Sequence, residues 1–282
     1  MKTKLIDYVD NGPIFITGHV NPDGDALGSA FALKLFLDSQ NIISDVDFDI
    51  TTKLPSNLNH LPYHLISDDL KEKYNTVFVF DCGNSSRLGK YEEVVLAAEN
   101  IVVIDHHVDP SFGDVQIIDP HAASTTQVLF RQFKDENIEI NEEMANCLLT
   151  GLITDTGRFQ YSNTTSEVFS IAAELLGNGA NLSKISENIY GSIEFNALTL
   201  QSKIIERIVL NEDLQFAHSI VFQNDYKDYQ VEPEETDFLI DVVRLVKEST
   251  VALLIKEQED GSFKGSLRSR GDIDVQKIAS IF

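Results

Sequence analysis

Long apolar segments, cysteines and basic residues are all scarce in this sequence of 282 residues. No stretch approaches the ~18 consecutive apolar residues of a membrane-spanning helix. The first residues, "MKTKLIDYVDNG", have no apolar segment like that of a signal peptide. The two cysteines, Cys82 and Cys147, form no C-x-x-C motif, which fits a reducing compartment. We therefore expect a cytoplasmic protein that does not enter a membrane.

The shortage of basic residues limits the partners of this chain. Lys and Arg total 22 against 45 Asp and Glu, so the formal net charge is −23. This balance argues against a protein that coats long nucleic acid, because such binding depends on Lys and Arg displacing counterions. A short phosphorylated substrate stays open, since metal ions can supply local positive charge.

Short apolar runs alternate with helix-like segments in the first half of the chain. The runs "PIFITG", "TVFVFD" and "NIVVID" are typical of buried parallel strands, and the strictly alternating "DVDFDI" predicts a half-exposed edge strand. Segments with a helical period separate these runs and begin at Ala26, Lys90, Ser124 and Asn141. This alternation predicts an α/β fold with a doubly wound, mostly parallel sheet.

The pattern changes at about Ile208, which indicates a smaller α+β domain. The segments "RIVLNEDLQFAHSIVFQ" and "TVALLIKEQEDGSFKGSLRSR" predict hairpins, and "EPEETDFLIDVVRLVKES" predicts a helix with Pro233 in its first turn. We expect a catalytic domain over residues 1–185, a helical linker over 186–207, a second domain over 208–282, and a cleft between the two lobes. The helix in "DIDVQKIASIF" ends without a cap, so we expect the second domain to be C-terminally incomplete.

Acidic and imidazole side chains follow three of the predicted strands at the point where each strand ends. These residues are His19, Asp23, Asp25, Asp81, Asp105, His106 and His107. A further carboxylate, Asp155, follows a helical segment in "TDTGRF". Ligands of open α/β sheets bind beyond the carboxyl ends of the strands, so we expect these side chains to converge there.

Each of these residues or motifs, taken alone, has a simpler interpretation. Asp25 precedes Ala26 and could serve only to cap the following helix, and an isolated Asp-His-His is often a surface turn. The combination instead favours metal binding, because crowded carboxylates repel one another unless cations neutralise them. Carboxylate and imidazole ligands together suit Mn²⁺, with Mg²⁺, Co²⁺, Fe²⁺ and Zn²⁺ as alternatives. Four aspartates and two histidines fit two metals roughly 3.5–4 Å apart that share one carboxylate.

The segments "HVNPDGDALGS", "FDCGNSSRLG", "IDHH" and "ITDTGRF" resemble, in this order, the four signature motifs of the DHH phosphoesterases. The resemblance covers about residues 10–185, and the remainder is similar to the DHH-associated C-terminal domain. Within the family, the sequence most resembles bacterial enzymes that degrade very short RNA (nano-RNA) and dephosphorylate pAp, adenosine 3′,5′-bisphosphate. The resemblance implies a hydrolase in which two metals activate a water for attack on phosphorus. A homodimer also fits the resemblance.

The resemblance also implies a role for each motif residue. One metal would be held by His19, Asp23 and Asp81. The second would be held by Asp25, Asp81, His106 and Asp155, so that Asp81 bridges the two. Asp105 would orient a histidine, and His107 would face the scissile phosphate as a donor or acid.

Substrate phosphates need cationic partners, and few are available in so acidic a chain. In the family, the strand that matches "GSLRSRGD" contacts a phosphate, which implies substrate binding by Arg268, Ser269 and Arg270. Arg158 in "TDTGRF" is a further candidate, with a salt bridge to the acidic cluster as its alternative role. The family's Gly-rich stretch with a histidine is not found before Phe282, which puts substrate affinity in doubt.

Two other functions stay open at this point. A phosphodiesterase for cyclic di-AMP or its linear product pApA shares the same motifs and lobes. A catalytically silent nucleotide-binding regulator belongs to another class, and the intact set of ligands speaks against it. A family II inorganic pyrophosphatase fits less well, because "GSLRSR" is not a dense basic cluster.

Overall fold

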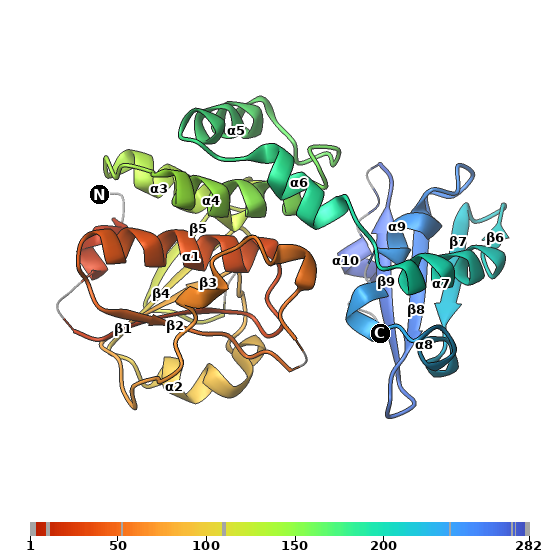
Figure 1. Ribbon diagram of the computed structural model, residues 1–282, viewed down its shortest axis with the longest axis horizontal. Helices are drawn as coiled ribbons and strands as arrows, with labels where there is room; N and C mark the ends of the chain where they lie inside the picture. The colour runs from red at the N-terminus through yellow and green to blue at the C-terminus, as the bar shows by residue number, and fades with distance from the viewer. Residues whose placement is uncertain are drawn as a thin grey trace. The chain divides into compact units, whose positions relative to one another are not determined.

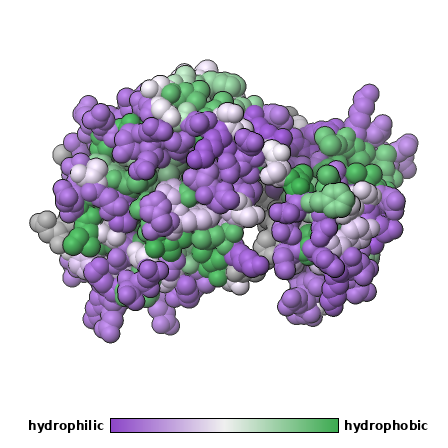
Figure 2. Space-filling model, viewed as in Figure 1, coloured by the Kyte–Doolittle hydropathy of each residue, from purple (hydrophilic) through white to green (hydrophobic). Residues whose placement is uncertain are grey.

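The computed structural model describes residues 4–9, 12–51, 53–108, 111–236, 238–271, 273 and 275–279. The chain divides into two compact units, Met1–Gly191 and Ser192–Phe282. Figure 2 shows that hydrophilic residues cover much of the visible face of each unit, as the high content of acidic residues leads one to expect. Among the described residues, no helix is both long enough and apolar enough to cross a bilayer.

A parallel five-stranded sheet forms the centre of the first unit. Its spatial order is β2-β1-β3-β4-β5, and the strands are β1 (Ile14–Gly18), β2 (Ser44–Val46), β3 (Thr76–Phe80), β4 (Asn100–Asp105) and β5 (Val115–Ile118). The strand order reverses between β1 and β3, and such a switch point opens a crevice in which doubly wound sheets bind their ligands. The predicted fold class is therefore confirmed.

Helices cover both faces of this sheet (Figure 1), and apolar side chains are buried against each face. The α-helices are α1 (Gly24–Ser39), α2 (Glu92–Leu96), α3 (Thr125–Asp135), α4 (Glu142–Asp155), α5 (Ser166–Gly177) and α6 (Leu182–Tyr190). Short 3-10 helices span η1 (Leu5–Tyr8), η2 (Ser56–Leu58), η3 (Tyr63–Leu65) and η4 (Ser85–Tyr91). Helices α1 and α4 touch closely at Gly28, where a Cβ atom would lie 2.4 Å from the Cys147 carbonyl oxygen.

The predicted strand "DVDFDI" is only partly correct, because β2 ends at Val46. Asp47 accepts the backbone N–H of Phe48 (2.8 Å) and the hydroxyl of Tyr91 on its side-chain carboxylate. Such local side-chain hydrogen bonds compete with the strand ladder. The chain therefore leaves the sheet after three residues.

The second unit contains a smaller mixed sheet in the order β6-β7-β8-β9. Its strands are β6 (Val209–Asn211), β7 (Phe216–Val221), β8 (Val251–Glu257) and β9 (Phe263–Ser269), and its helices are α7 (Phe195–Glu206), α8 (Gln223–Tyr229), η5 (Pro233–Thr236), α9 (Leu239–Arg244) and α10 (Val275–Ala279). The antiparallel pairs β6–β7 and β8–β9 are the two predicted hairpins. The helix expected after Pro233 consists of η5 and α9. Residues 280–282, at the end of the predicted last helix, lie outside the described residues.

Helix α7 belongs to the core of the second unit. Its residues Ala197, Leu200 and Ile204 are buried in the same cluster as Leu239 of α9 and Leu254 of β8. The boundary between the units, after Gly191, lies between α6 and α7. The part of the expected linker that forms α7 thus packs against the second sheet.

An ion pair between Arg207 and Asp225 stabilises the second unit in a pH-dependent way. Burial raises the pKa of Asp225, but hydrogen bonds from Arg207 (Nη2 to Oδ1, 2.8 Å) and from the Phe222 N–H (2.7 Å) outweigh it and lower the pKa. A carboxyl with a lowered folded-state pKa stabilises the fold above its unfolded-state pKa of about 3.9, and this stabilisation is lost as the pH falls below that value.

We expect Asp225→Asn to lower the free energy of unfolding by roughly 2–3 kcal/mol at pH 7, because Arg207 loses its charged partner. The difference from the wild type should shrink below about pH 4, where the carboxyl of the unfolded wild-type chain gains a proton before that of the folded chain does. Urea unfolding at several pH values measures this. Asp241→Asn, at an exposed carboxylate 3.9 Å from Arg244, is the control and should change little. An equal loss of unfolding free energy in Asp225→Asn at all pH values would show that the pair of Arg207 and Asp225 does not titrate as described.

Candidate metal centre

The ends of β1, β3 and β4 bring the predicted site residues together at the switch point of the first sheet. His19 follows the last residue of β1, Asp81 follows β3, and Asp105 ends β4. Strands β1 and β3 are paired neighbours, and so are β3 and β4. The convergence expected from the strand ends is therefore present in the structure.

Asp81 lies at the centre of the group. Its Oδ2 is 3.5 Å from His19 Nε2, and its Oδ1 is 3.7 Å from His106 Nε2 and 3.4 Å from His107 Nδ1. Its backbone adopts a left-handed conformation (φ 54°), which costs a side-chain-bearing residue roughly 1–2 kcal/mol. The two oxygens of one buried carboxylate thus face histidines from two different strand ends.

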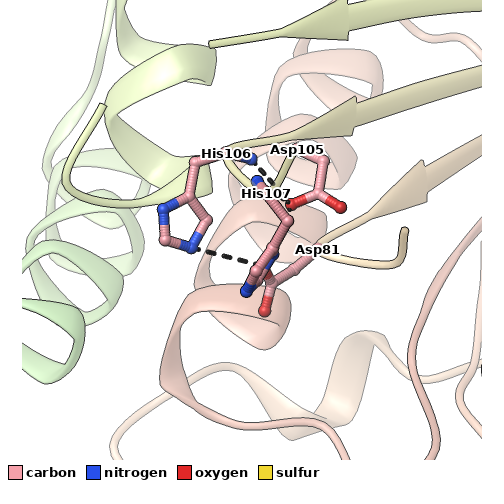
Figure 3. A group of neighbouring side chains, drawn as sticks. All are labelled: Asp81, Asp105, His106 and His107. Carbon is pink, nitrogen blue, oxygen red and sulfur yellow. Dashed lines mark hydrogen bonds and ion pairs between the residues drawn. The ribbon is translucent and has the colours of Figure 1, made fainter. Parts of the chain in front are cut away.

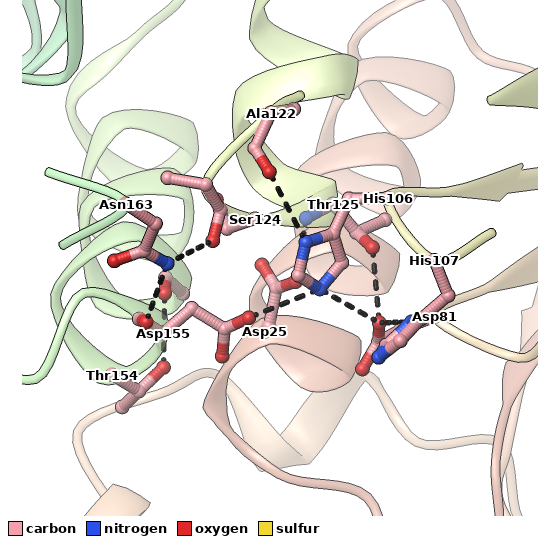
Figure 4. A network of polar contacts seen from close by, with 12 residues as sticks. Asp25, Asp81, His106, His107, Ala122, Ser124, Thr125, Thr154, Asp155 and Asn163 are labelled. Carbon is pink, nitrogen blue, oxygen red and sulfur yellow. Dashed lines mark hydrogen bonds and ion pairs between the residues drawn. The ribbon is translucent and has the colours of Figure 1, made fainter. Parts of the chain in front are cut away.

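Asp23 and Asp25 have different local roles. The side chain of Asp23 caps α1, since its Oδ1 accepts the backbone N–H groups of Asp25 (3.0 Å) and Ala26 (3.1 Å). The capping role considered for Asp25 therefore belongs to Asp23. Asp25 is fully buried and points into the cluster (Figure 4). Asp23 Oδ1 also lies 3.9 Å from His19 Nε2, so this carboxylate reaches the cluster as well.

His106 and Asp155 complete the cluster on the side of α4. Asp155 is the last residue of α4, and its Oδ2 lies 3.2 Å from His106 Nε2. The other ring nitrogen of His106 lies 3.3 Å from the carbonyl oxygen of Ala122, which turns Nε2 toward the carboxylates. Asn163 holds the backbone beside Asp155 in place, because its side-chain amide donates to the backbone carbonyls of Ala123 (3.2 Å) and Asp155 (3.1 Å).

Asp105 holds the two histidines that follow it (Figure 3). Its Oδ1 accepts the backbone N–H groups of His106 (2.7 Å) and His107 (3.0 Å) and lies 2.8 Å from His107 Nδ1. The carboxylate is fully buried, and its Oδ2 has no hydrogen-bond partner among the described residues. Because Nδ1 of His107 is bound to Asp105, Nε2 is the ring atom left for a ligand, on a side chain that is 42% exposed.

The cluster carries several carboxylates without a matching set of cationic side chains. Among the described residues, no lysine or arginine forms an ion pair with any carboxylate of this cluster. Burial lowers the pKa of His19, but hydrogen bonds to Asp23 and Asp81 outweigh it and raise the pKa to about 10. Burial and neighbouring carboxylates raise the pKa of Asp155 to about 7. The ring nitrogen of His19 and the carboxylate of Asp155 therefore bind protons more tightly than usual. A divalent cation would use the same atoms as ligands and must displace these protons to bind.

The donor atoms fit divalent cations. Three groups of side chains among the described residues offer atoms that all lie within 4.8 Å of one another. The first is His19, Asp23 and Asp81, the second is Asp25, His106 and Asp155, and the third is Asp81, Asp105, His106 and His107. Mixed carboxylate and imidazole donors are typical ligands of Mn²⁺ and related metals. Asp81 belongs to the first and third groups, and its Oδ1 also lies 3.7 Å from Nε2 of His106 in the second.

Comparison with known proteins agrees with this geometry. Residues 13–152 match the DHH family, N-terminal domain. A Thermus thermophilus protein named bifunctional oligoribonuclease and PAP phosphatase NrnA is 32% identical over 277 residues, which cover 95% of this chain and 79% of that protein. This chain belongs to the DHH family.

Other members of the DHH family match over most of their length. A Streptococcus mutans protein named probable bifunctional oligoribonuclease and PAP phosphatase NrnA is 27% identical over 284 residues, covering 99% of this chain and 88% of that protein. The crystal structure of an exopolyphosphatase-related protein from Bacteroides fragilis superposes with a TM-score of 0.90 at 25% identity, over 98% of this chain and 84% of that one. The resemblance read from the motifs is therefore confirmed.

The residues predicted to bind substrate lie in both units of this DHH protein. Arg158 follows Asp155 by three positions, and its guanidinium lies 3.8 Å from the ring centroid of Tyr190 rather than in an ion pair with the acidic cluster. Arg268 and Ser269 are in β9 of the second unit, and Arg270 follows directly. The guanidinium groups of both arginines donate to backbone carbonyls, Arg268 Nη1 to Leu267 (3.0 Å) and Arg270 Nη1 to Lys247 (3.4 Å).

The sequence predicts a helix that begins at Ser124, the N-cap of α3, but the contacts of its first residues with the site were missed. The backbone N–H groups of Thr125 and Thr126 donate to Asp25, and the Thr125 hydroxyl donates to Asp81. Ser124 and Gln127 have the spacing typical of a helix start, and Ser124 Oγ accepts the Gln127 N–H (3.0 Å). That spacing predicts where the helix begins but not that it faces the strand ends.

Proposed function

We propose that this DHH protein is a metal-dependent phosphoesterase that hydrolyses short oligoribonucleotides and pAp. The observation that carries the proposal is the buried cluster in which Asp81 faces His19 through one oxygen and His106 through the other. The names of the relatives from Thermus thermophilus and Streptococcus mutans support this choice of substrates. The buried free thiols of Cys82 and Cys147 support a reducing compartment, and we place the protein in the cytoplasm.

We assign two cations, with Mn²⁺ as the first candidate, to the first two of these donor groups. His19, Asp23 and Asp81 would hold the first cation. Asp25, His106 and Asp155 would hold the second, together with the other oxygen of Asp81. Bound there, the cations would acidify a water and neutralise the charge that develops on the phosphoryl oxygens.

His107 supplies the proton that the leaving oxygen needs. Hydrolysis joins the water oxygen to phosphorus and breaks the bond from phosphorus to the nucleoside oxygen, which must gain a proton. Hydrogen bonds to Asp105 and Asp81 raise the pKa of His107 to about 10, a shift that favours the charged, proton-donating form of the imidazole. Asp105 fixes Nδ1, which leaves the Nε2 proton for the substrate.

We assign Arg158, Arg268, Ser269 and Arg270 to the substrate phosphates that the cations do not reach. The guanidinium group matches the geometry of a phosphate. Arg158 is exposed, and it and the following Phe159 both adopt a positive φ of 62°, which is unfavourable for residues with a side chain. Such strained backbone often accompanies functional sites.

The test is a comparison of kcat/KM on four substrates with the full chain and Mn²⁺. The substrates are pAp, pApA, cyclic di-AMP and 5′-labelled RNA of about two to five nucleotides. We expect RNA and pAp to be hydrolysed fastest and EDTA to abolish turnover of both. Preference for cyclic di-AMP or pApA would favour the phosphodiesterase alternative. Bound metal without turnover of any substrate would favour a catalytically silent nucleotide-binding regulator.

A further inference from the structure

The N-terminus of α3 contacts two carboxylates of the candidate metal centre through one residue. The Thr125 N–H donates to Asp25 Oδ2 (2.6 Å), and the Thr125 hydroxyl donates to Asp81 Oδ1 (3.1 Å) (Figure 4). The Thr126 N–H donates to the second oxygen of Asp25 (2.9 Å). Thr125 is fully buried, so these contacts are shielded from water.

The geometry points to Thr125 as a positioning residue that fixes Asp25 and Asp81 relative to each other. This inference rests on the proposed function, in which the two carboxylates bind different cations and Asp81 bridges. One side chain and its own backbone N–H join both carboxylates, so their separation is set by a single rigid residue. A β-branched side chain such as Thr has few rotamers, which makes this link stiff.

The Thr125 hydroxyl also distinguishes the two carboxylate oxygens of Asp81. It donates to Oδ1, the oxygen that faces His106 and His107, and leaves Oδ2 toward His19. Oδ1 of Asp81 therefore accepts a hydrogen bond from the neutral Thr125 hydroxyl, whereas Oδ2 accepts none from it. Hydrogen bonds of this kind to a ligating carboxylate orient it, and their loss typically costs about 10- to 100-fold in metal affinity.

The helix end is anchored independently of the carboxylates. Ser124 Oγ accepts the Gln127 N–H (3.0 Å), and the Gln127 side chain accepts the Ala123 N–H (2.7 Å). The N–H groups of the first helical residues are normally free to bind an anion, and the helix dipole favours negative charge there. Removal of the Thr125 hydroxyl therefore leaves the cap and both N–H contacts to Asp25 in place.

The test compares Mn²⁺ binding and thermal unfolding of the full chain for three variants. Thr125→Val keeps the shape and the backbone N–H but loses the hydroxyl, and Thr125→Ser keeps both donors. Thr150→Val is the matched control, because it also removes a buried hydroxyl, one that donates to the Asn146 carbonyl (2.8 Å) and not to a site carboxylate. Mn²⁺ titration followed by electron paramagnetic resonance counts the bound ions without any substrate.

We expect Thr125→Val to weaken Mn²⁺ binding by about 10- to 100-fold, Thr125→Ser to restore it, and Thr150→Val to leave it unchanged. Equal binding by the wild type and Thr125→Val would overturn the role of Thr125 and leave the proposed function standing. Equal weakening by Thr125→Val and Thr150→Val would show a purely structural effect and overturn it too. A wild type that binds no Mn²⁺ would overturn both proposals.

Discussion

Asp81→Asn is expected to abolish binding of both cations and to lower hydrolysis by at least about 10³-fold. Asparagine has the same size and tolerates the left-handed backbone of residue 81, so the fold should persist. The amide carries no charge, and its nitrogen repels a cation. Because both oxygens of Asp81 face histidines of the cluster, one substitution removes a ligand from each proposed cation. Mn²⁺ titration together with turnover of labelled RNA measures both effects.

Two other variants make this result specific. Asp25→Asn changes a residue of only one donor group and should leave one Mn²⁺ bound. Asp38→Asn makes the same chemical change at a surface ion pair with Lys34 and should change neither stoichiometry nor turnover. Two tightly bound Mn²⁺ ions in Asp81→Asn would refute the bridging role of Asp81.

The second large effect is expected at His107. His107→Gln should retain both cations and lower kcat by about 10²- to 10⁴-fold, because glutamine cannot supply the proton for the leaving oxygen. An aryl phosphodiester such as bis(p-nitrophenyl) phosphate has a leaving group that needs no proton. The variant should therefore lose much less activity on that substrate than on RNA, and comparison of the two rate ratios measures the contribution of proton donation.

His121→Gln is the matched control for His107, since His121 is exposed and its backbone N–H contacts Asp119 outside the cluster. It should hydrolyse both substrates at the wild-type rate. An equal loss of activity by His107→Gln on RNA and on the aryl ester would contradict proton donation, and a loss of bound Mn²⁺ would make His107 a ligand instead.

The strand ends could be predicted from the sequence because their signal is local. The runs that form β1, β3 and β4 are continuous apolar segments, and each is followed at once by an acid or a histidine. Parallel strands place such residues at one edge of the sheet, so periodicity alone brings His19, Asp81 and Asp105 together. Asp155 is a candidate from the sequence too, but it ends a helix and not a strand, so the strand ends alone do not place it in the cluster.

Other features depend on contacts between distant residues, which no local pattern records. Thr125 and Asp25 are 100 positions apart, and nothing beside either residue indicates the other. The cap of α1 illustrates a second difficulty, since Asp23 and Asp25 are both suitable caps and only the backbone geometry selects Asp23. The short edge strand β5 (Val115–Ile118) has a single buried residue, Ile117, so its pattern is too weak to predict.

The most direct measurement is an anomalous difference map from crystals of the full chain soaked with Mn²⁺ and recorded at the manganese absorption edge. Two peaks about 3.5–4 Å apart are expected. Asp81 should contact both, with His19 and Asp23 at one peak and Asp25, His106 and Asp155 at the other. A single peak, or peaks away from Asp81, would contradict the assignment of this cluster as a two-cation phosphoesterase site.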